Sequence, residues 1–382
     1  MATIPSIAMI PSGVKAGKLY SVLPTDGAGD FTTTRASVAT RVNENGLIEE
    51  VASNVPRLDY SDGGCPSLLL EPTATNPITY SEDFSDASWT KAGNAVVTPN
   101  NAISPDGTLN ASTVTGLDGT GTNDLYTQPT FNTSNKTVTY SVYLKGSGTL
   151  RINVSNNIDD NSSKTLTLTS NWERYFITYS FNASTSTQMV CNLDDLSATA
   201  TTYEVWGAQL EENSYSTSYI KTVGTTQTRV ADTASGSGNS TVINSTEGTL
   251  YGEFSNTEND TNYNRINLSD GTVTNWVFIG KEGANVRAYL RANNLTVLSN
   301  QTTPLASINR VALSYKSGDI RLYVNGVQII VVTDAFSFTA PLNKLNFGDY
   351  NGIATASKAS WKSVQVYTTA LSDAELTTLT TI

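Results

Sequence analysis

The chain has 382 residues, more than one ordinary hydrophobic core needs, so we expect two or three domains. It carries 34 acidic and 23 basic side chains, and the net charge of −11 argues against nucleic acid as a partner. Histidine is absent, which excludes Ser-His-Asp and Cys-His hydrolases.

The first residues, MATIPSIAMIPSG, contain neither a basic cluster nor an apolar run of signal-peptide length. No later stretch approaches the roughly 18 apolar residues of a membrane-spanning helix. We therefore expect a chain that is made in the cytosol, stays soluble and does not insert into membranes. Its two cysteines, Cys65 and Cys191, are far apart in sequence, and we expect both to be free, buried thiols.

Residues 1–78 contain short extended runs such as KLYSVL, FTTTRASVATRV and GLIEEV, which indicate small β-hairpins without a core of their own. Asn45 and Gly46 predict a two-residue hairpin turn, since both central positions of such a turn need a positive φ. Further on, an Asp-Gly-Gly turn precedes Leu68, Leu69 and Leu70. So short an arm cannot bury three leucines by itself. We therefore expect them to anchor it against the sandwich that follows or against a neighbouring subunit.

Residues 79–224 contain runs with strict period-two alternation. In TVTYSVYL, Val138, Tyr140, Val142 and Leu144 share one face of the predicted strand. RINV, ERYFITYSF and YEVWGAQLE are similar runs of strand length. This pattern predicts an antiparallel sandwich with one buried face per sheet.

Residues 225–245 have a Gly-Ser core that predicts a flexible linker. The β pattern resumes over residues 246–382, where Asn325 and Gly326 again predict a tight hairpin. Ser372-Asp-Ala-Glu forms a capping box and predicts one short terminal helix. The predicted fold class is all-β, with a hairpin arm, two antiparallel β-sandwiches and a final helix.

Three groups of motifs resemble known families. LYVNGVQI, KLNFGD and WKSVQVYTTALSDAEL resemble the concanavalin A-like, laminin-G-type lectin sandwich. NPITYSEDFSDASWTKAG, NWERYFITYSF and YEVWGAQLEE are similar to carbohydrate-binding-module-type jelly rolls of phage proteins. FTTTRASVATRVNENGLIEEV and NVPRLDYSDGGCPSLLLEPTATN are similar to the segment that precedes those jelly rolls in phage head-spike and tail-fibre proteins.

The resemblance implies a virion structural protein of a bacteriophage, a head fibre or spike, a capsid decoration or a tail fibre. It implies a virion-docking arm (1–78), a jelly roll (79–224), a linker (225–245) and a lectin sandwich (246–382). The chain would be synthesised in the host cytoplasm and displayed on the virion surface. Its partners would be capsid or tail proteins and bacterial surface carbohydrate. We expect a homotrimer, because linked weak sites gain effective concentration. A bacterial surface adhesin and a polysaccharide depolymerase remain alternatives.

A glycosidase would need two carboxylates about 5–10 Å apart across a cleft. Asp194 with Asp195, and Glu211 with Glu212, are sequence neighbours that point to opposite faces of a strand. We therefore expect no enzymatic activity.

Two acidic loops, LDGTGTND and NNIDDN, carry Asp118, Asp124, Asp159 and Asp160, whose oxygens are ligands that calcium accepts. No EF-hand pattern is present, and turn chemistry alone also places aspartate in such loops. Calcium is therefore a hypothesis, and we expect no other cofactor.

In the last third, Arg287, Tyr289 and Arg291 share one face of the run VRAYLRA, opposite Val286, Ala288 and Leu290. Trp276 begins the preceding run, WVFIG. Aromatic rings stack on sugar faces, and an arginine can donate hydrogen bonds beside them. This polar and aromatic face is the predicted carbohydrate-binding surface, and a subunit interface is an equal alternative.

Overall fold

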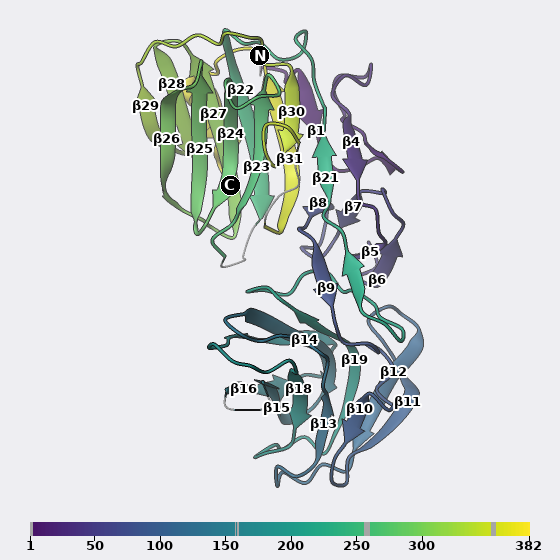
Figure 1. The fold of residues 1–382 in the computed structure, drawn as a ribbon. Helices are drawn as coiled ribbons and strands as arrows, with labels where there is room; N and C mark the ends of the chain where they lie inside the picture. Colours follow the sequence, from purple (N-terminus) through teal and green to yellow (C-terminus); the bar gives the residue numbers. More distant parts are fainter. Residues whose placement is uncertain (1–2, 157, 159, 256–259, 353–356) are drawn as a thin grey trace. The chain divides into compact units, whose positions relative to one another are not determined.

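The computed structural model describes residues 3–156, 158, 160–255, 260–352 and 357–382. The fold is all-β, with antiparallel sheets and, within these ranges, one short helix near the C-terminus (Figure 1), which confirms the predicted fold class. Over the same ranges no helix is both long and apolar enough to cross a bilayer.

The chain divides into two compact units whose composition differs from the predicted domains. Unit 1 combines Met1–Gly46, Glu50–Thr73 and Val230–Ile382, and unit 2 consists of Leu47–Glu49 and Ala74–Arg229. Most of the predicted arm therefore belongs to the same unit as the predicted lectin sandwich. Unit 2 corresponds closely to the predicted jelly-roll segment.

The larger sheet of unit 1 has the strand order β29-β28-β27-β22-β31-β8-β7, and β1 also pairs with β31. Its strands are β1 (Ile7–Met9), β7 (Arg57–Asp59), β8 (Ser67–Leu70), β22 (Glu247–Ser255), β27 (Ile308–Lys316), β28 (Asp319–Val324), β29 (Val327–Val332) and β31 (Ala359–Tyr367). Along β31, β22 occupies one side, and β1 and β8 pair with the other. Strands from the N-terminal segment therefore complete this sheet.

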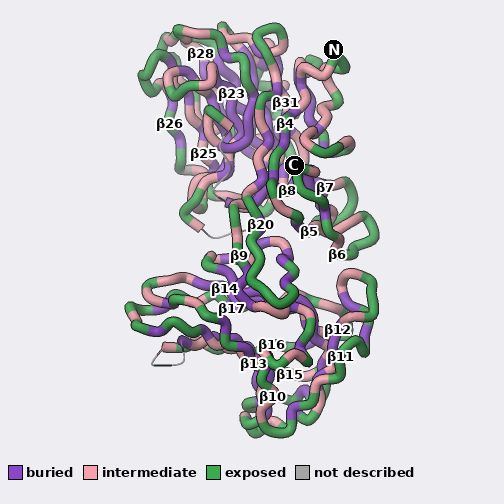
Figure 2. Tube along the Cα trace, turned by 45° about the vertical axis from the view of Figure 1, so that its right-hand side comes forward, coloured by how far each residue is buried: buried purple, intermediate pink, exposed green. Residues whose placement is uncertain are grey.

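The second sheet of unit 1 has the order β26-β25-β24-β23-β30. Its strands are β23 (Tyr263–Ser269), β24 (Trp276–Glu282), β25 (Asn285–Ala292), β26 (Leu295–Pro304) and β30 (Lys344–Phe347). The two sheets enclose one apolar core, in which Leu250, Val277 and Trp361 are fully buried. Figure 2 shows buried chain along β23 and exposed chain along much of the edge strand β26.

Leu68, Leu69 and Leu70 lie on β8 and are at most 4% exposed. Leu68 and Leu70 join the core of the unit 1 sandwich, because β8 pairs with β31 in a register that sets Leu68 opposite Trp361. They do anchor the N-terminal segment. The prediction that they pack against the first sandwich or a neighbouring subunit is wrong, because these leucines pack into the C-terminal sandwich of their own unit.

Shorter N-terminal strands form two small sheets, of order β2-β3-β4-β21 and β5-β6. They are β2 (Val14–Lys15), β3 (Lys18–Leu19), β4 (Phe31–Thr34), β5 (Ala39–Val42), β6 (Ile48–Val51) and β21 (Thr233–Ser235). Phe31 is fully buried, and its ring centroid lies 5.2 Å from that of Phe347. The sheet β2-β3-β4-β21 therefore shares the core of unit 1, which also contains Leu19 and Ala234.

The segment 225–245 is ordered by specific contacts, contrary to the predicted flexible linker. It contains β20 (Gln227–Arg229) in unit 2 and β21 in unit 1. Within the Gly-Ser core, Ser237 is fully buried and exchanges backbone hydrogen bonds of 3.2 and 2.6 Å with Leu345. Gly236 and Gly238 have φ values of 75° and 85°. Glycine adopts this left-handed region without steric cost, so these glycines allow the turns of the segment and do not make it flexible.

Unit 2 is a sandwich of two five-stranded antiparallel sheets, β10-β13-β18-β15-β16 and β11-β12-β19-β14-β17, accompanied by the pair β9 and β20. The strands are β9 (Ala74–Asn76), β10 (Trp89–Lys91), β11 (Val96–Ile103), β12 (Leu109–Thr115), β13 (Asp124–Thr127), β14 (Thr137–Gly146), β15 (Gly148–Ser155), β16 (Asn161–Leu168), β17 (Glu173–Ser180), β18 (Val190–Asp194) and β19 (Thr202–Glu211). Their inward apolar side chains form a separate core.

Strand β14 shows where the alternation rule falls short. Val138 and Tyr140 are fully buried in the sandwich core, as predicted. Thr139 and Ser141, on the other face, are also fully buried. Thr139 donates a 2.9 Å hydrogen bond to the backbone oxygen of Asn213, so the segment after β19 covers this second face.

The two cysteines differ in environment. Cys191 lies on β18 and is fully buried, and burial raises the pKa of its thiol. Cys65 is exposed in the turn after Gly64, so the expectation of two buried thiols is wrong for this residue. Both are free, as predicted.

The terminal helix α1 (Asp373–Thr380) confirms the predicted capping box. The backbone N–H of Ser372 donates a 2.9 Å hydrogen bond to the carboxylate of Glu375. Leu376 is fully buried against Tyr251 and Ala312. The helix therefore covers the outer face of the larger sheet of unit 1.

Candidate functional site

The outer face of the second sheet in unit 1 carries an unusual set of side chains. On β25, Val286, Ala288 and Leu290 are fully buried in the core, whereas the alternate residues Arg287 and Tyr289 are partly exposed. Strand pairing sets each outward residue beside an outward residue of β24 or β26. We call this surface the outer face of β23–β26.

An aromatic cluster occupies the middle of the outer face of β23–β26. Trp276 and Phe278 lie two residues apart on β24, with ring centroids 4.6 Å apart. Tyr289 on β25 stacks on Phe278 at 5.2 Å with an interplanar angle of 20°. The rings of Tyr289 and Tyr350 each lie 5.7 Å from that of Trp276. The sheet register fixes the rings of Trp276, Phe278 and Tyr289 relative to one another, because it pairs Phe278 with Tyr289 and Trp276 with Arg291.

Arg265 on β23 covers one end of this cluster. Its guanidinium lies 4.5 Å from the ring centroid of Phe278 and 4.1 Å from that of Tyr263. It also forms an ion pair with Glu282 and lies 3.8 Å from Asp349. Because two carboxylates and two rings share this cation, Arg265 is a fixed part of the surface.

Two further arginines follow along β25. Arg287 donates a 3.0 Å hydrogen bond to the hydroxyl of Ser299 and lies 3.4 Å from the carboxylate of Glu282. Arg291 lies directly opposite Trp276 in the strand register. Within the part of the chain that the structure describes, the side chain of Arg291 has no hydrogen bond or ion pair, and its buried Nε lacks an acceptor.

A cleft of about 490 Å³ adjoins the outer face at the β25–β26 turn. It is lined by Ala292, Asn293, Leu295, Thr296, Val297, Asp334, Ala335, Phe336 and Ser337. Thr296 lies opposite Arg291 on the neighbouring strand, and its hydroxyl is 2.7 Å from that of Tyr289. Ligand sites in proteins typically have volumes of about 300–1,000 Å³, so the cleft can hold a small molecule or one or two sugar rings.

The structure therefore brings Trp276, Tyr289, Arg287 and Arg291 together on one surface. Sequence reasoning missed Phe278, Arg265 and Tyr350. The alternation in YNRINLS and NWVFIG could have placed Arg265 and Phe278 on outward faces. Nothing in the sequence indicates Tyr350, which follows β30 in a loop and reaches the cluster only through the fold.

Two aspartates of the calcium hypothesis, Asp118 and Asp160, are hydrogen-bonded within the protein. The carboxylate of Asp118 accepts hydrogen bonds from Thr120 and from the side chain of Asn123. That of Asp160 accepts bonds from the Tyr179 hydroxyl at 2.5 Å and from Asn182, and these contacts lower its pKa.

Asp124 lies opposite Asp194 in the register of β13 and β18. Burial first, and then the nearby Asp194, raise the pKa of Asp124. Asp159 lies outside the described residues. Over the described ranges, no three acidic or cysteine side chains gather as ligands for a metal ion. The structure therefore gives the calcium hypothesis no assembled site.

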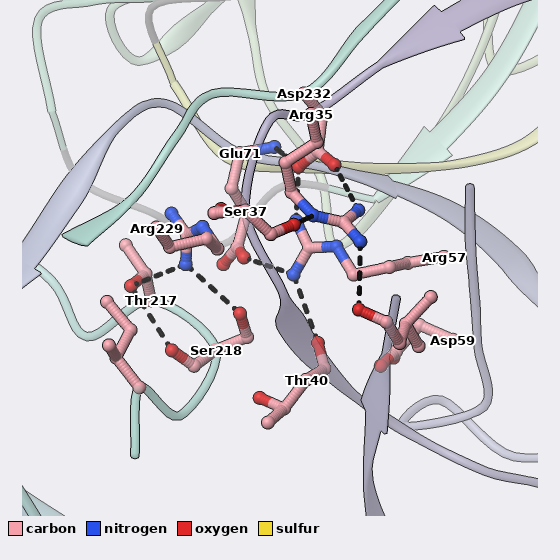
Figure 3. Close-up of polar contacts among 12 residues, drawn as sticks. Arg35, Ser37, Thr40, Arg57, Asp59, Glu71, Thr217, Ser218, Arg229 and Asp232 are labelled. Atoms are coloured by element: carbon pink, nitrogen blue, oxygen red, sulfur yellow. Dashed lines mark hydrogen bonds and ion pairs between the residues drawn. The ribbon is translucent and has the colours of Figure 1, made fainter. Parts of the chain in front are cut away.

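A buried charge network lies in unit 1 (Figure 3). Arg57, which is fully buried, forms ion pairs with Glu71 at 2.7 Å and with Asp232. Arg35 reaches the second oxygen of Asp232 at 3.0 Å. Burial alone would lower the pKa of Arg57, but Asp232 and Glu71 raise it above its ordinary value.

The cavity beside this network measures about 10 Å³, room for about one water molecule. No substrate can therefore reach its charges. The network links β7 and the end of β8 to the residue just before β21, and its role is to hold the N-terminal segment in unit 1.

No family model matches the chain, and no curated protein is similar to it. Among solved structures, the chain is similar to the carbohydrate-binding module CBM40 of the Ruminococcus gnavus IT-sialidase, bound to α2,3-sialyllactose. The two share 24% sequence identity with a TM-score of 0.33, and the match covers 39% of this chain and 94% of that chain. Domain 4 of the arabinanase AbnA from Geobacillus stearothermophilus, bound to arabinotriose, has 16% identity, coverages of 44% and 84%, and a TM-score of 0.33. Tailspike protein 4 of bacteriophage CBA120 has 8% identity, coverages of 35% and 21%, and a TM-score of 0.30.

Proposed function

We propose that the chain is a virion structural protein of a bacteriophage, a head fibre or spike or a tail fibre, that adheres to bacterial surface glycans. The virion assignment rests on the resemblance of the N-terminal and middle motifs to phage spike and fibre proteins. The glycan assignment rests on the outer face of β23–β26.

The observation that carries the glycan assignment is the ring cluster with hydrogen-bonding groups around it. The fixed rings of Trp276 and Tyr289 offer an apolar surface, on which the C–H face of a pyranose can stack. Arg287 and Arg291 supply donors at its margin, and Thr296 supplies a hydroxyl. A surface of this kind binds without needing an acid or a base.

We propose a binding role without a catalytic step. Three of the four carboxylates considered earlier for catalysis make structural contacts. Asp194 pairs with Arg151 at 2.7 Å, and Asp195 accepts hydrogen bonds from the backbone of residues 118–123. Glu211 is 1% exposed and accepts a 2.9 Å bond from the backbone of Thr217. These contacts favour adhesion over hydrolysis.

The proposed assembly is a homotrimer on the virion surface, attached to capsid or tail proteins. A single sugar site of this open kind binds weakly, and three linked copies raise the effective concentration at a glycan-coated cell. The chain alone would then bind isolated oligosaccharides more weakly than particles bind cells.

The glycan part is tested with the full chain carrying Trp276→Ala or Tyr289→Ala, measured by retention on host cells and on a glycan array. Loss of either ring removes stacking surface, and we expect retention to fall about tenfold or more, as for the loss of about 1.5 kcal/mol. Tyr20→Ala removes a partly exposed tyrosine elsewhere in unit 1 and serves as the control. Wild-type retention by both ring variants would refute this part.

The virion part is tested separately by immunogold electron microscopy and peptide mass spectrometry of purified phage particles. We expect label at regularly spaced positions on the head or tail. Absence of the chain from assembled particles would overturn the virion assignment and leave the glycan test unaffected.

A further inference from the structure

Arg291 differs from the other two arginines of the outer face of β23–β26. Arg265 pairs with Glu282 and Asp349, and Arg287 lies beside the same Glu282. Within the described ranges the side chain of Arg291 has neither a carboxylate partner nor a hydrogen-bond acceptor, and it shares with Arg265 and Arg287 an enclosed Nε that lacks an acceptor. A partly desolvated cation without a counter-charge is unfavourable, and an anion placed against its outer nitrogens would relieve that cost.

The surroundings of Arg291 define what such an anion would be attached to. Trp276 lies directly opposite on β24, and Thr296 lies directly opposite on β26. A ring that stacks on Trp276 would carry its substituents toward the guanidinium. The cleft of about 490 Å³ begins at Thr296, so a chain of linked rings has room to continue beyond Arg291.

We propose that the glycan bound on this face is acidic, and that Arg291 holds the carboxylate of a sugar residue whose ring stacks on Trp276. This inference rests on the proposed function and adds the chemical class of the ligand. The planar fork of arginine matches a carboxylate with two parallel hydrogen bonds, which a neutral hydroxyl cannot reproduce. The next sugar along the chain would enter the cleft lined by Asn293 and Phe336.

Because the protein has a net negative charge, a preference for acidic glycans would have to come from a local contact. At −11, the protein as a whole repels an anionic polysaccharide, so long-range attraction cannot account for its binding. Binding of an acidic glycan therefore requires a specific cation at the contact. Raising the salt concentration should weaken the Arg291 contact and screen the general repulsion at the same time.

The test uses the full chain and matched pairs of oligosaccharides, in which each acidic member, such as an oligogalacturonate, hyaluronan fragment or sialylated oligosaccharide, is compared with its own methyl ester. Isothermal titration should show at least one acidic member that binds about tenfold to a hundredfold more tightly than its ester, the range expected for a charge-assisted hydrogen bond. Arg291→Gln should remove that preference, so that the acidic member and its ester bind about equally. Arg291→Lys should restore part of it.

Arg321→Gln is the matched control, because Arg321 lies on β28 in the other sheet and is ion-paired with Asp319 and Asp373. If no acidic member is preferred while a neutral glycan binds in a manner that depends on Trp276, the inference falls and the proposed function stands. If the Trp276→Ala and Arg291→Gln variants each bind every ligand as the wild type does, the inference and the glycan part of the proposed function are both refuted. Competition by inorganic phosphate as strong as that by the acidic sugar would replace carboxylate with phosphate and overturn the inference.

Discussion

At the scale of single residues, the buried ion pairs of unit 1 connect parts of the chain that are far apart in sequence. Arg57 bonds Glu71 and Asp232, and the backbone N–H of Glu71 donates a 3.0 Å bond to the same Asp232. These charges lie at most 5% exposed, so water cannot replace a lost partner. Each charged group is therefore stable in the buried state only while its oppositely charged partners are present.

Replacing Arg57 with methionine should lower the free energy of unfolding of unit 1 by about 3–5 kcal/mol, because it leaves buried carboxylates without this cation. Chemical denaturation of the full chain measures this loss. Adding Glu71→Gln to Arg57→Met should recover part of it. Lys316→Met, which removes an exposed pair with Glu247, should cost about 1 kcal/mol or less. Equal losses for Arg57 and Lys316 would contradict the proposed role of the network.

A second residue-scale feature is Asp195 of unit 2. Its carboxylate is fully buried and accepts backbone hydrogen bonds from Asp118, Gly119, Gly121 and Asn123, and a 2.8 Å bond from the Asn123 side chain. Burial opposes ionisation, but these bonds outweigh it and lower the pKa to about 2. They fix the loop between β12 and β13.

Because the folded pKa lies below the ordinary value of 3.8, Asp195 contributes stability above that value, and the contribution is lost as the pH falls toward 2. Asp195→Asn should therefore lower the melting temperature of unit 2 at pH 5, by an amount that corresponds to about 1–3 kcal/mol. Near pH 2 the difference from the wild type should shrink. Calorimetry at the two pH values measures both differences, and an equal difference at both would show that ionisation of Asp195 is unimportant.

At the scale of strands and turns, the sequence predicted the features that depend on neighbouring residues, namely the faces of strands and some of the tight turns. Strand β14 contains the whole of the predicted run TVTYSVYL, and the outward set of β25 follows from period two. Asn325 and Gly326 form the predicted two-residue turn, with φ values of 49° and 82°. Asn45 and Gly46 do not, since only Gly46 has a positive φ, and a longer connection joins β5 to β6.

Pairing over long sequence distances could not be predicted in this way. Alternation indicates which face a side chain takes but not which strand lies beside it. β1 pairs with β31 across more than 350 residues, and the Ser-Gly-Ser segment pairs with β30 through Ser237. The outer face of β23–β26 shows the same limit. Its β25 residues follow from sequence, whereas the position of Tyr350 depends on the complete sheet.

At the scale of the whole molecule, the main segment of unit 2, Ala74–Arg229, is an insertion into unit 1. The chain leaves unit 1 after Thr73 and returns at Val230, and the backbone N–H of Ala231 donates a 3.1 Å bond to the hydroxyl of Thr73. The two ends of the insertion in unit 1 are therefore adjacent. Residues 246–382, in contrast, lack Ile7, Met9 and the leucines of β8, which belong to the same core.

Excising residues 74–229 and joining Thr73 to Val230 through a short glycine-serine linker should give a unit 1 that unfolds in one cooperative transition, because the break is closed where the ends already meet. Residues 246–382 alone should fail to fold, since one side of β31 would lose β1 and β8 and the core would lose their side chains. Circular dichroism and thermal melting of the two proteins compare them directly. If residues 246–382 unfold cooperatively with the same melting temperature as the excised protein, the N-terminal strands are not needed for the stability of this sandwich. Loss of folding in the excised protein alone would mean that unit 1 depends on the inserted unit.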